Sequence, residues 1–73
     1  MSWWWQSPAV LRVVIVNLRH DSTEAVRGVL WTSRGPWLVL RNAALLRGNQ
    51  EPAPVDGDVI IPRDNVSFLQ VLP

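Results

Sequence analysis

The sequence Ile60-Ile61-Pro62-Arg63-Asp64-Asn65-Val66-Ser67-Phe68-Leu69 places an apolar segment on each side of three polar residues. Its apolar flanks are rich in β-branched and aromatic side chains, which favour strands. The polar residues between them have the composition of a tight turn, because Asp and Asn side chains bond to nearby backbone groups. We therefore predict a short strand over residues 58–62, an immediate turn, and a closing strand over residues 66–72.

The chain before this stretch repeats the same alternation of apolar segments and turn signals. We expect a strand over residues 10–18, apolar on both faces, and a second over residues 25–32. Gly28 lies in the middle of the second strand, where glycine usually marks a bend, a bulge or a close backbone approach. A third strand begins at Trp37, and we expect it to continue as a bent strand through residues 42–46, with a helical turn there as the alternative.

The five expected strands give the fold class. Residues 48–57 form the one long loop, which its prolines keep stiff. Five short strands separated by turn signals predict an all-β domain, a strongly bent small barrel, over residues 10–73. Residues 1–9 form a short N-terminal arm or helix that is rich in tryptophan.

Composition indicates a subunit of something larger. The chain has 73 residues, 48% of them hydrophobic, with five tryptophans and no cysteine. A chain of this length buries only about 60% of its unfolded surface, and it has no disulfide to compensate. It is nevertheless too apolar for disorder, which needs low hydrophobicity and high net charge. We expect a homo-oligomer that also contacts a larger structural protein, such as a capsid shell.

Charge and hydropathy limit the other partners. The formal net charge is +1, lysine is absent, and the seven arginines occur singly. Because nucleic-acid binders usually concentrate basic charge, we expect weak nucleic-acid binding or none. No apolar run approaches the roughly 20 residues that cross a bilayer, and the start does not resemble a signal peptide. We expect no membrane contact, and a location in a cytoplasm or in a particle assembled there.

No catalytic or metal site is expected. His20, Asp21 and Ser22 are adjacent in the sequence, whereas a catalytic triad converges from separate segments. Asp56 and Asp58 flank a glycine, but the further carboxylates of a calcium loop do not follow. We therefore predict a protein that is not an enzyme and has no cofactor and no bound metal.

Three stretches in order resemble the Sm-like (LSm) family. They are Val26-Arg27-Gly28-Val29-Leu30, then Leu38-Val39-Leu40-Arg41-Asn42-Ala43, then residues 60–69, and the resemblance covers about residues 10 to 72. It implies a strongly bent barrel whose subunits close into a ring, with the fourth strand of one protomer paired to the fifth strand of the next.

The expected pairing edges are apolar and carry no protective charge, which leaves them open to another chain. Alternation predicts that Val66, Phe68 and Leu72 face one side of the last strand and that Leu69 and Val71 face the other. Tryptophan is enriched at interfaces, so we expect contacts from the arm, with a short helix that caps the open end of the barrel as the alternative. The predicted interface residues are Trp3, Trp4, Trp5, Ile60, Ile61, Phe68, Leu69 and Val71.

The resemblance breaks at the polar positions that RNA-binding members of the family use. Ser33 or Arg34 stands at the family's Asp position, Trp37 at its Asn position, and Pro62 and Arg63 at its Arg-Gly pair. Trp37 could still stack on a base, and Arg63 could reach a phosphate. Packing of Trp37 in a core or against a partner is the favoured alternative.

These departures favour a structural or interaction subunit over an RNA-binding ring. The small size, the arginine-only basic set and the apolar composition suit a virion protein of a tailed phage, as a minor capsid, cement or neck component. The alternative is an Sm-like ring that acts in RNA regulation, with Trp37 and Arg63 as nucleic-acid contacts.

Overall fold

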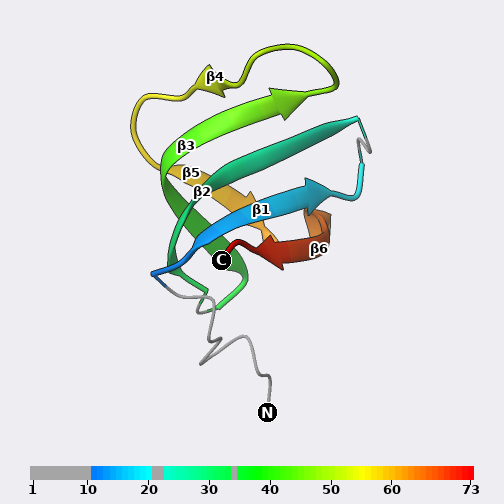
Figure 1. Ribbon diagram of the computed structural model, residues 1–73. Coiled ribbons are helices and arrows are strands. Elements are labelled where there is room, and N and C mark those ends of the chain that lie inside the picture. Colours follow the sequence, from blue (N-terminus) through cyan, green and yellow to red (C-terminus); the bar gives the residue numbers. More distant parts are fainter. Residues whose placement is uncertain (1–10, 21–22, 34) are drawn as a thin grey trace.

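The computed structural model describes residues 11–20, 23–33 and 35–73. These residues form a small all-β domain of antiparallel strands in one open sheet (Figure 1). Its only helical segment in the described ranges is one 3₁₀ turn, Arg63–Asn65. The strands are β1 (Val13–Leu18), β2 (Glu24–Thr32), β3 (Trp37–Arg47), β4 (Ala53–Pro54), β5 (Val59–Pro62) and β6 (Val66–Val71).

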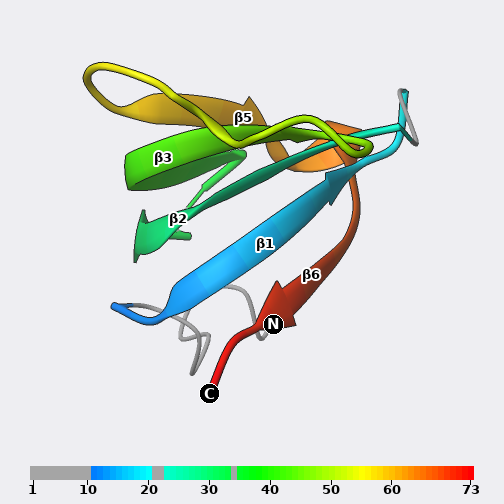
Figure 2. The same cartoon turned by 45° about the horizontal axis from the view of Figure 1, so that its top comes forward.

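The strands run in the order β4-β3-β2-β1-β6, and β5 pairs with the first half of β3. The two-residue β4 pairs with the second half of β3, at Ala44 and Leu45. Figure 2 shows how strongly the sheet bends. The strands β5 and β6 lie at opposite ends of the sheet, although only the 3₁₀ turn separates them along the chain. The expected strands and the expected turn after residue 62 are therefore confirmed. The strand β4, inside the predicted loop, is an addition to them.

The core lies on the concave face and follows the period-2 alternation of the strands. Leu30, Leu38 and Leu40 have no exposed surface, and their neighbours along each strand face outward. The remaining buried hydrophobic members of this cluster are Val14, Val16, Val26, Ala43, Ile61 and Val66. One layer of aliphatic side chains thus holds the two halves of the bent sheet together.

The sheet bends at an irregularity in the pairing of β2 with β3. The register between these strands shifts between Arg27 and Val29, around Gly28, and Asn42 on β3 has a positive φ of 52°. Residues 42–46 remain strand and do not form a helical turn, so the bent-strand prediction is confirmed. Gly28 lies at the close backbone approach that its position in the strand predicted.

Along β6, Leu69 and Val71 share one face and Phe68 faces the other, as predicted, but the predicted side of Val66 is wrong because of a bulge. The pairing with β1 moves from Asn17–Phe68 to Leu18–Val66, which leaves Ser67 as an extra residue. An extra residue of this kind moves the side chains beyond it to the other face. Val66 therefore faces the core together with Leu69, and not together with Phe68.

Candidate functional site

The open edge of β5 carries an exposed isoleucine. Ile61 is buried opposite Leu38, whereas Ile60 lies on the outer face and is 60% exposed. The Arg63 N–H donates to the Pro36 carbonyl at 2.8 Å. Because bonded and unbonded pairs alternate along an antiparallel ladder, the N–H and C=O of Ile60 point away from β3. Ile60 thus presents its side chain and its backbone groups at this edge.

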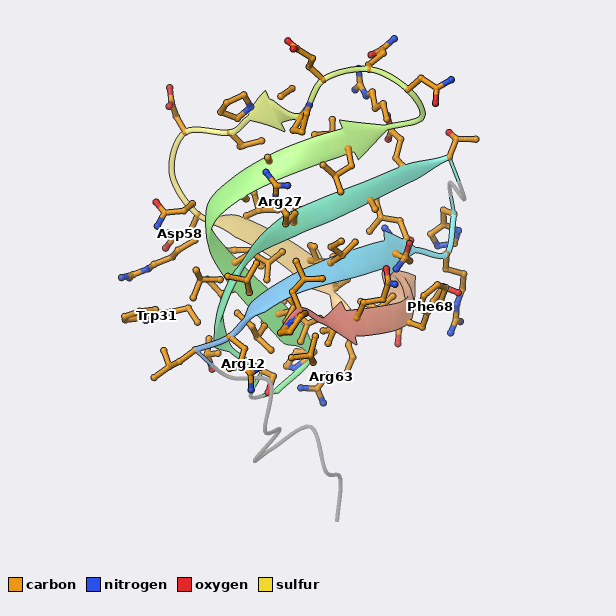
Figure 3. All side chains as sticks on the ribbon, viewed as in Figure 1. Arg12, Arg27, Trp31, Asp58, Arg63 and Phe68 are labelled. Carbon is orange, nitrogen blue, oxygen red and sulfur yellow. The ribbon has the colours of Figure 1, made fainter. Side chains whose placement is uncertain are left out.

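The open edge of β6 is also apolar. Phe68, the third residue of β6, lies on the outer face and is 56% exposed (Figure 3). Leu69 lies opposite Val16 and packs partly against the core. No charged residue occurs in β6, and the strand contains no proline. An edge of this kind invites pairing with another strand.

Backbone groups of inward-facing residues line the β6 edge. The Leu72 N–H donates to the Val13 carbonyl at 2.9 Å, so by the same alternation the backbones of Leu69 and Val71 point away from β1. Val71 lies opposite the fully buried Val14 and faces inward, yet it is 43% exposed. The core is therefore open beside Val71.

The third edge of the sheet is protected. β4 contains only Ala53 and Pro54, and Pro52 precedes it. Short edge strands and prolines are common ways of preventing a further strand from pairing. Of the described edges, β6 alone has neither a proline nor a charged residue, whereas β5 is four residues long and ends in Pro62.

The two candidate nucleic-acid residues lie close together but differ in accessibility. A surface hollow lined by Gly35, Pro36, Pro62 and Asp64 contains both Trp37 and Arg63. Trp37 is 49% exposed, so it is not a core residue. The Arg63 side chain is part-buried, and its guanidinium donates to the Ser33 carbonyl. Arg63 thus joins the turn after β2 to the turn after β5.

A cluster of Trp31, Arg41 and Asp58 on the outer face was not predicted from the sequence. The guanidinium of Arg41 lies 4.0 Å from the centre of the Trp31 ring, and its Nε lies 3.4 Å from Oδ1 of Asp58. The three side chains come from β2, β3 and the loop before β5, and Figure 3 shows Trp31 and Asp58 on the same side of the molecule. The register of β2 on β3 brings them together, and no local sequence signal specifies that register.

The other candidates add no chemistry. His20 is exposed, and its backbone N–H donates to the Asn65 side chain at 3.2 Å. Within residues 11–20, 23–33 and 35–73, no group of three or more His, Cys, Asp or Glu is placed to hold a metal. No helix in that part of the chain is long and apolar enough to cross a bilayer. The predicted contacts Trp3, Trp4 and Trp5 lie outside the described residues.

The structure is a small all-β domain in one open sheet, with Ile60 and Phe68 exposed on two of its edge strands. No protein-family model matches the sequence, and no curated protein matches it.

Proposed function

We propose that this chain is a non-enzymatic subunit that assembles with copies of itself through the edges of β5 and β6. The observation that carries the proposal is the exposure of large apolar side chains on two open edges of one sheet. Each edge is hydrogen-bonded on one side only in the described sheet, and Ile60 and Phe68 lie exposed along them. Pairing removes both liabilities, since it uses the free backbone groups and buries the side chains.

The Sm-like resemblance supports a closed assembly. The short β5, the three-residue turn Arg63–Asn65 and β6 occur in the order that the resemblance implies, and β5 and β6 have no backbone pairing with each other in the described sheet. We infer an Sm-like barrel whose gap between β5 and β6 is closed by neighbouring subunits. Head-to-tail contacts of this kind produce rings when the rotation closes.

The setting we propose is a tailed-phage particle, in which the assembly contacts a larger shell or neck protein. The support is compositional: a chain of 73 residues, arginine without lysine, and five tryptophans. Detection of this chain in purified particles, at a stoichiometry that matches a ring, tests this setting. Its absence from purified particles would remove the setting and leave the assembly proposal unaffected.

An RNA-binding ring remains the second candidate because one observation favours it. Trp37 is about half exposed and lines a hollow at the surface, where a base could stack. The contact between Arg63 and the Ser33 carbonyl opposes this function, because it engages a donor of the guanidinium that lines the same hollow as Trp37.

The mass of the full chain in solution tests the assembly proposal directly. The chain has a mass of 8.3 kDa, and we expect light scattering or sedimentation equilibrium to give a single species at a whole-number multiple of this value. A stable monomer that persists at high protein concentration would overturn the proposal.

A further inference from the structure

The faces of the two open edges impose a condition on how they can pair. Residues directly opposite each other in an antiparallel ladder have their side chains on the same face. The free backbone groups of β5 belong to the outward-facing Ile60, and those of β6 belong to the inward-facing Leu69 and Val71. Antiparallel pairing of β5 with β6 of a second copy therefore places the Ile60 side chain on the core side of that copy.

We propose that each subunit inserts Ile60 into the open side of its neighbour's core and receives the neighbour's Phe68 over its own core. The occupant of each edge is a second copy of this chain, so the inference rests on the assembly proposed above. In the proposed contact the convex face of one sheet continues into the concave face of the next. Neither edge then leaves a large apolar side chain exposed.

The exposure of the residues involved supports this exchange. Val71 faces the core side but remains 43% exposed, and an isoleucine opposite Leu69 would be its diagonal neighbour. Ile60 and Phe68 are the two most exposed large hydrophobic residues of β5 and β6. Phe68 occupies the outer face because the bulge at Ser67 lies between it and Val66. The same bulge therefore sets which side chains each subunit gives to its neighbour.

The positions of the prolines select the register. With Ile60 opposite Leu69 of the second copy, Asp58 lies opposite Val71, and both can exchange N–H and C=O groups. Pro62 has no N–H, and it then lies opposite Ser67, where the ladder with β1 is already irregular. In the neighbouring register, Ile60 lies opposite Val71. Asp58 then lies opposite Pro73, and Pro62 lies opposite Leu69, so an N–H donor is missing at each end of the ladder.

Cysteine cross-linking between two different variants tests the exchange, and the natural chain contains no cysteine to interfere. In the proposed register Val59 faces Gln70 of the second copy in an unbonded pair, the closer of the two pair types. A mixture of Val59→Cys and Gln70→Cys subunits, assembled together and oxidised, is expected to give covalent dimers that reductant reverses. Each variant alone should give none. The pair Ile60→Cys and Gln70→Cys is the matched control, because adjacent side chains on opposite faces should not cross-link.

Each other result has a separate meaning. An assembled protein in which Val59→Cys and Gln70→Cys do not cross-link would overturn the exchange and leave the proposed function intact. Cross-linking of Val59→Cys with Leu72→Cys instead would overturn the register. Gln70→Cys cross-linking with itself would indicate a two-fold β6–β6 contact and overturn the exchange. A monomer in the same buffer without oxidant would remove the proposed function itself.

Discussion

A methyl group added at Gly28 would lie 3.0 Å from the carbonyl oxygen of Arg41 on the adjacent strand. The same position would be 3.3 Å from Cα of Ala43 and from Cβ of Leu40. Backbone atoms cannot rotate away as a flexible side chain can, so the bend of β3 over β2 requires the absence of a side chain here. The glycine at this position therefore determines how tightly the sheet curves.

We expect Gly28→Ala to destabilise the domain by about 1–3 kcal/mol, the usual cost of overpacking. Urea unfolding followed by circular dichroism measures the change. Val55→Ala is the control, since Val55 is exposed on a loop and its truncation should change the free energy of unfolding by less than about 0.5 kcal/mol. Equal stability of Gly28→Ala and the natural chain would show that the approach relaxes without cost.

Arg63 should act in stability and not in binding. Arg63→Ala leaves the buried Ser33 carbonyl without this donor, and loss of a hydrogen bond to a charged group costs about 1.5–3 kcal/mol. Arg63→Lys keeps the charge but loses the planar fork of donors, so it should restore only part of the stability. Chemical denaturation of the three proteins gives the comparison. Full stability of both variants would show that the contact between the two turns is dispensable.

The strands could be predicted because their signals are local. β-branched runs, the turn at residues 63–65 and the single mid-strand glycine each specify structure within a few residues. The phase of β6 could not be predicted, because Ser67 is a bulge only in relation to Asn17 and Leu18 on another strand. The Trp31–Arg41 contact escaped prediction for the same reason, since it depends on the register of β2 on β3.

The sequence predicted which strands form the open edges, but not which face of the sheet each side chain on those edges occupies. The apolar character of Ile60 and Phe68 is visible in the sequence. Which of them carries free backbone groups follows only from the ladder hydrogen bonds at Pro36 and Val13. The engagement of Arg63 with Ser33 requires two turns to meet that are 30 residues apart, and the sequence gives no signal for that meeting.

Charged substitutions at the open edges should dissociate the assembly without unfolding the subunit. Ile60→Lys and Phe68→Lys alter exposed side chains. We therefore expect each substitution to change the free energy of unfolding of the dissociated subunit by less than about 0.5 kcal/mol. The mass in solution should fall to 8.3 kDa. Sedimentation velocity measures the mass and circular dichroism measures folding.

Two matched variants separate assembly from folding in that experiment. Val55→Lys places the same charge on an exposed residue away from both edges, and it should leave the mass unchanged. Leu69→Lys should unfold the subunit as well, because Leu69 packs against the core. Retention of the assembly by both Ile60→Lys and Phe68→Lys would place the contact elsewhere on the surface.

The stacking of Arg41 on Trp31 should contribute only modestly to stability. The Trp31 side chain and the ion pair with Asp58 are both partly exposed, and exposed cation–π contacts are worth about 0.5–1 kcal/mol. A double-mutant cycle with Trp31→Leu and Arg41→Met should give a coupling energy in that range. A coupling near zero would show that the contact has no energetic role, and the two single variants would then be additive.

Nucleic-acid binding should be weak and only slightly dependent on salt. The net charge is +1, and two of the arginines, Arg41 and Arg47, already pair with Asp58 and Glu24. Affinity for single strands falls with salt with a slope of about −0.7 for each phosphate neutralised. We therefore expect fluorescence anisotropy with a labelled oligonucleotide to give a slope smaller in magnitude than about 2, and a Kd weaker than about 10 μM at physiological salt.

Two tryptophan variants separate stacking from non-specific binding in this experiment. Trp37→Ala and the matched Trp31→Ala should bind alike. Tight RNA binding that Trp37→Ala abolishes and Trp31→Ala retains would instead establish the RNA-binding ring, because it would assign the affinity to the exposed ring beside Arg63.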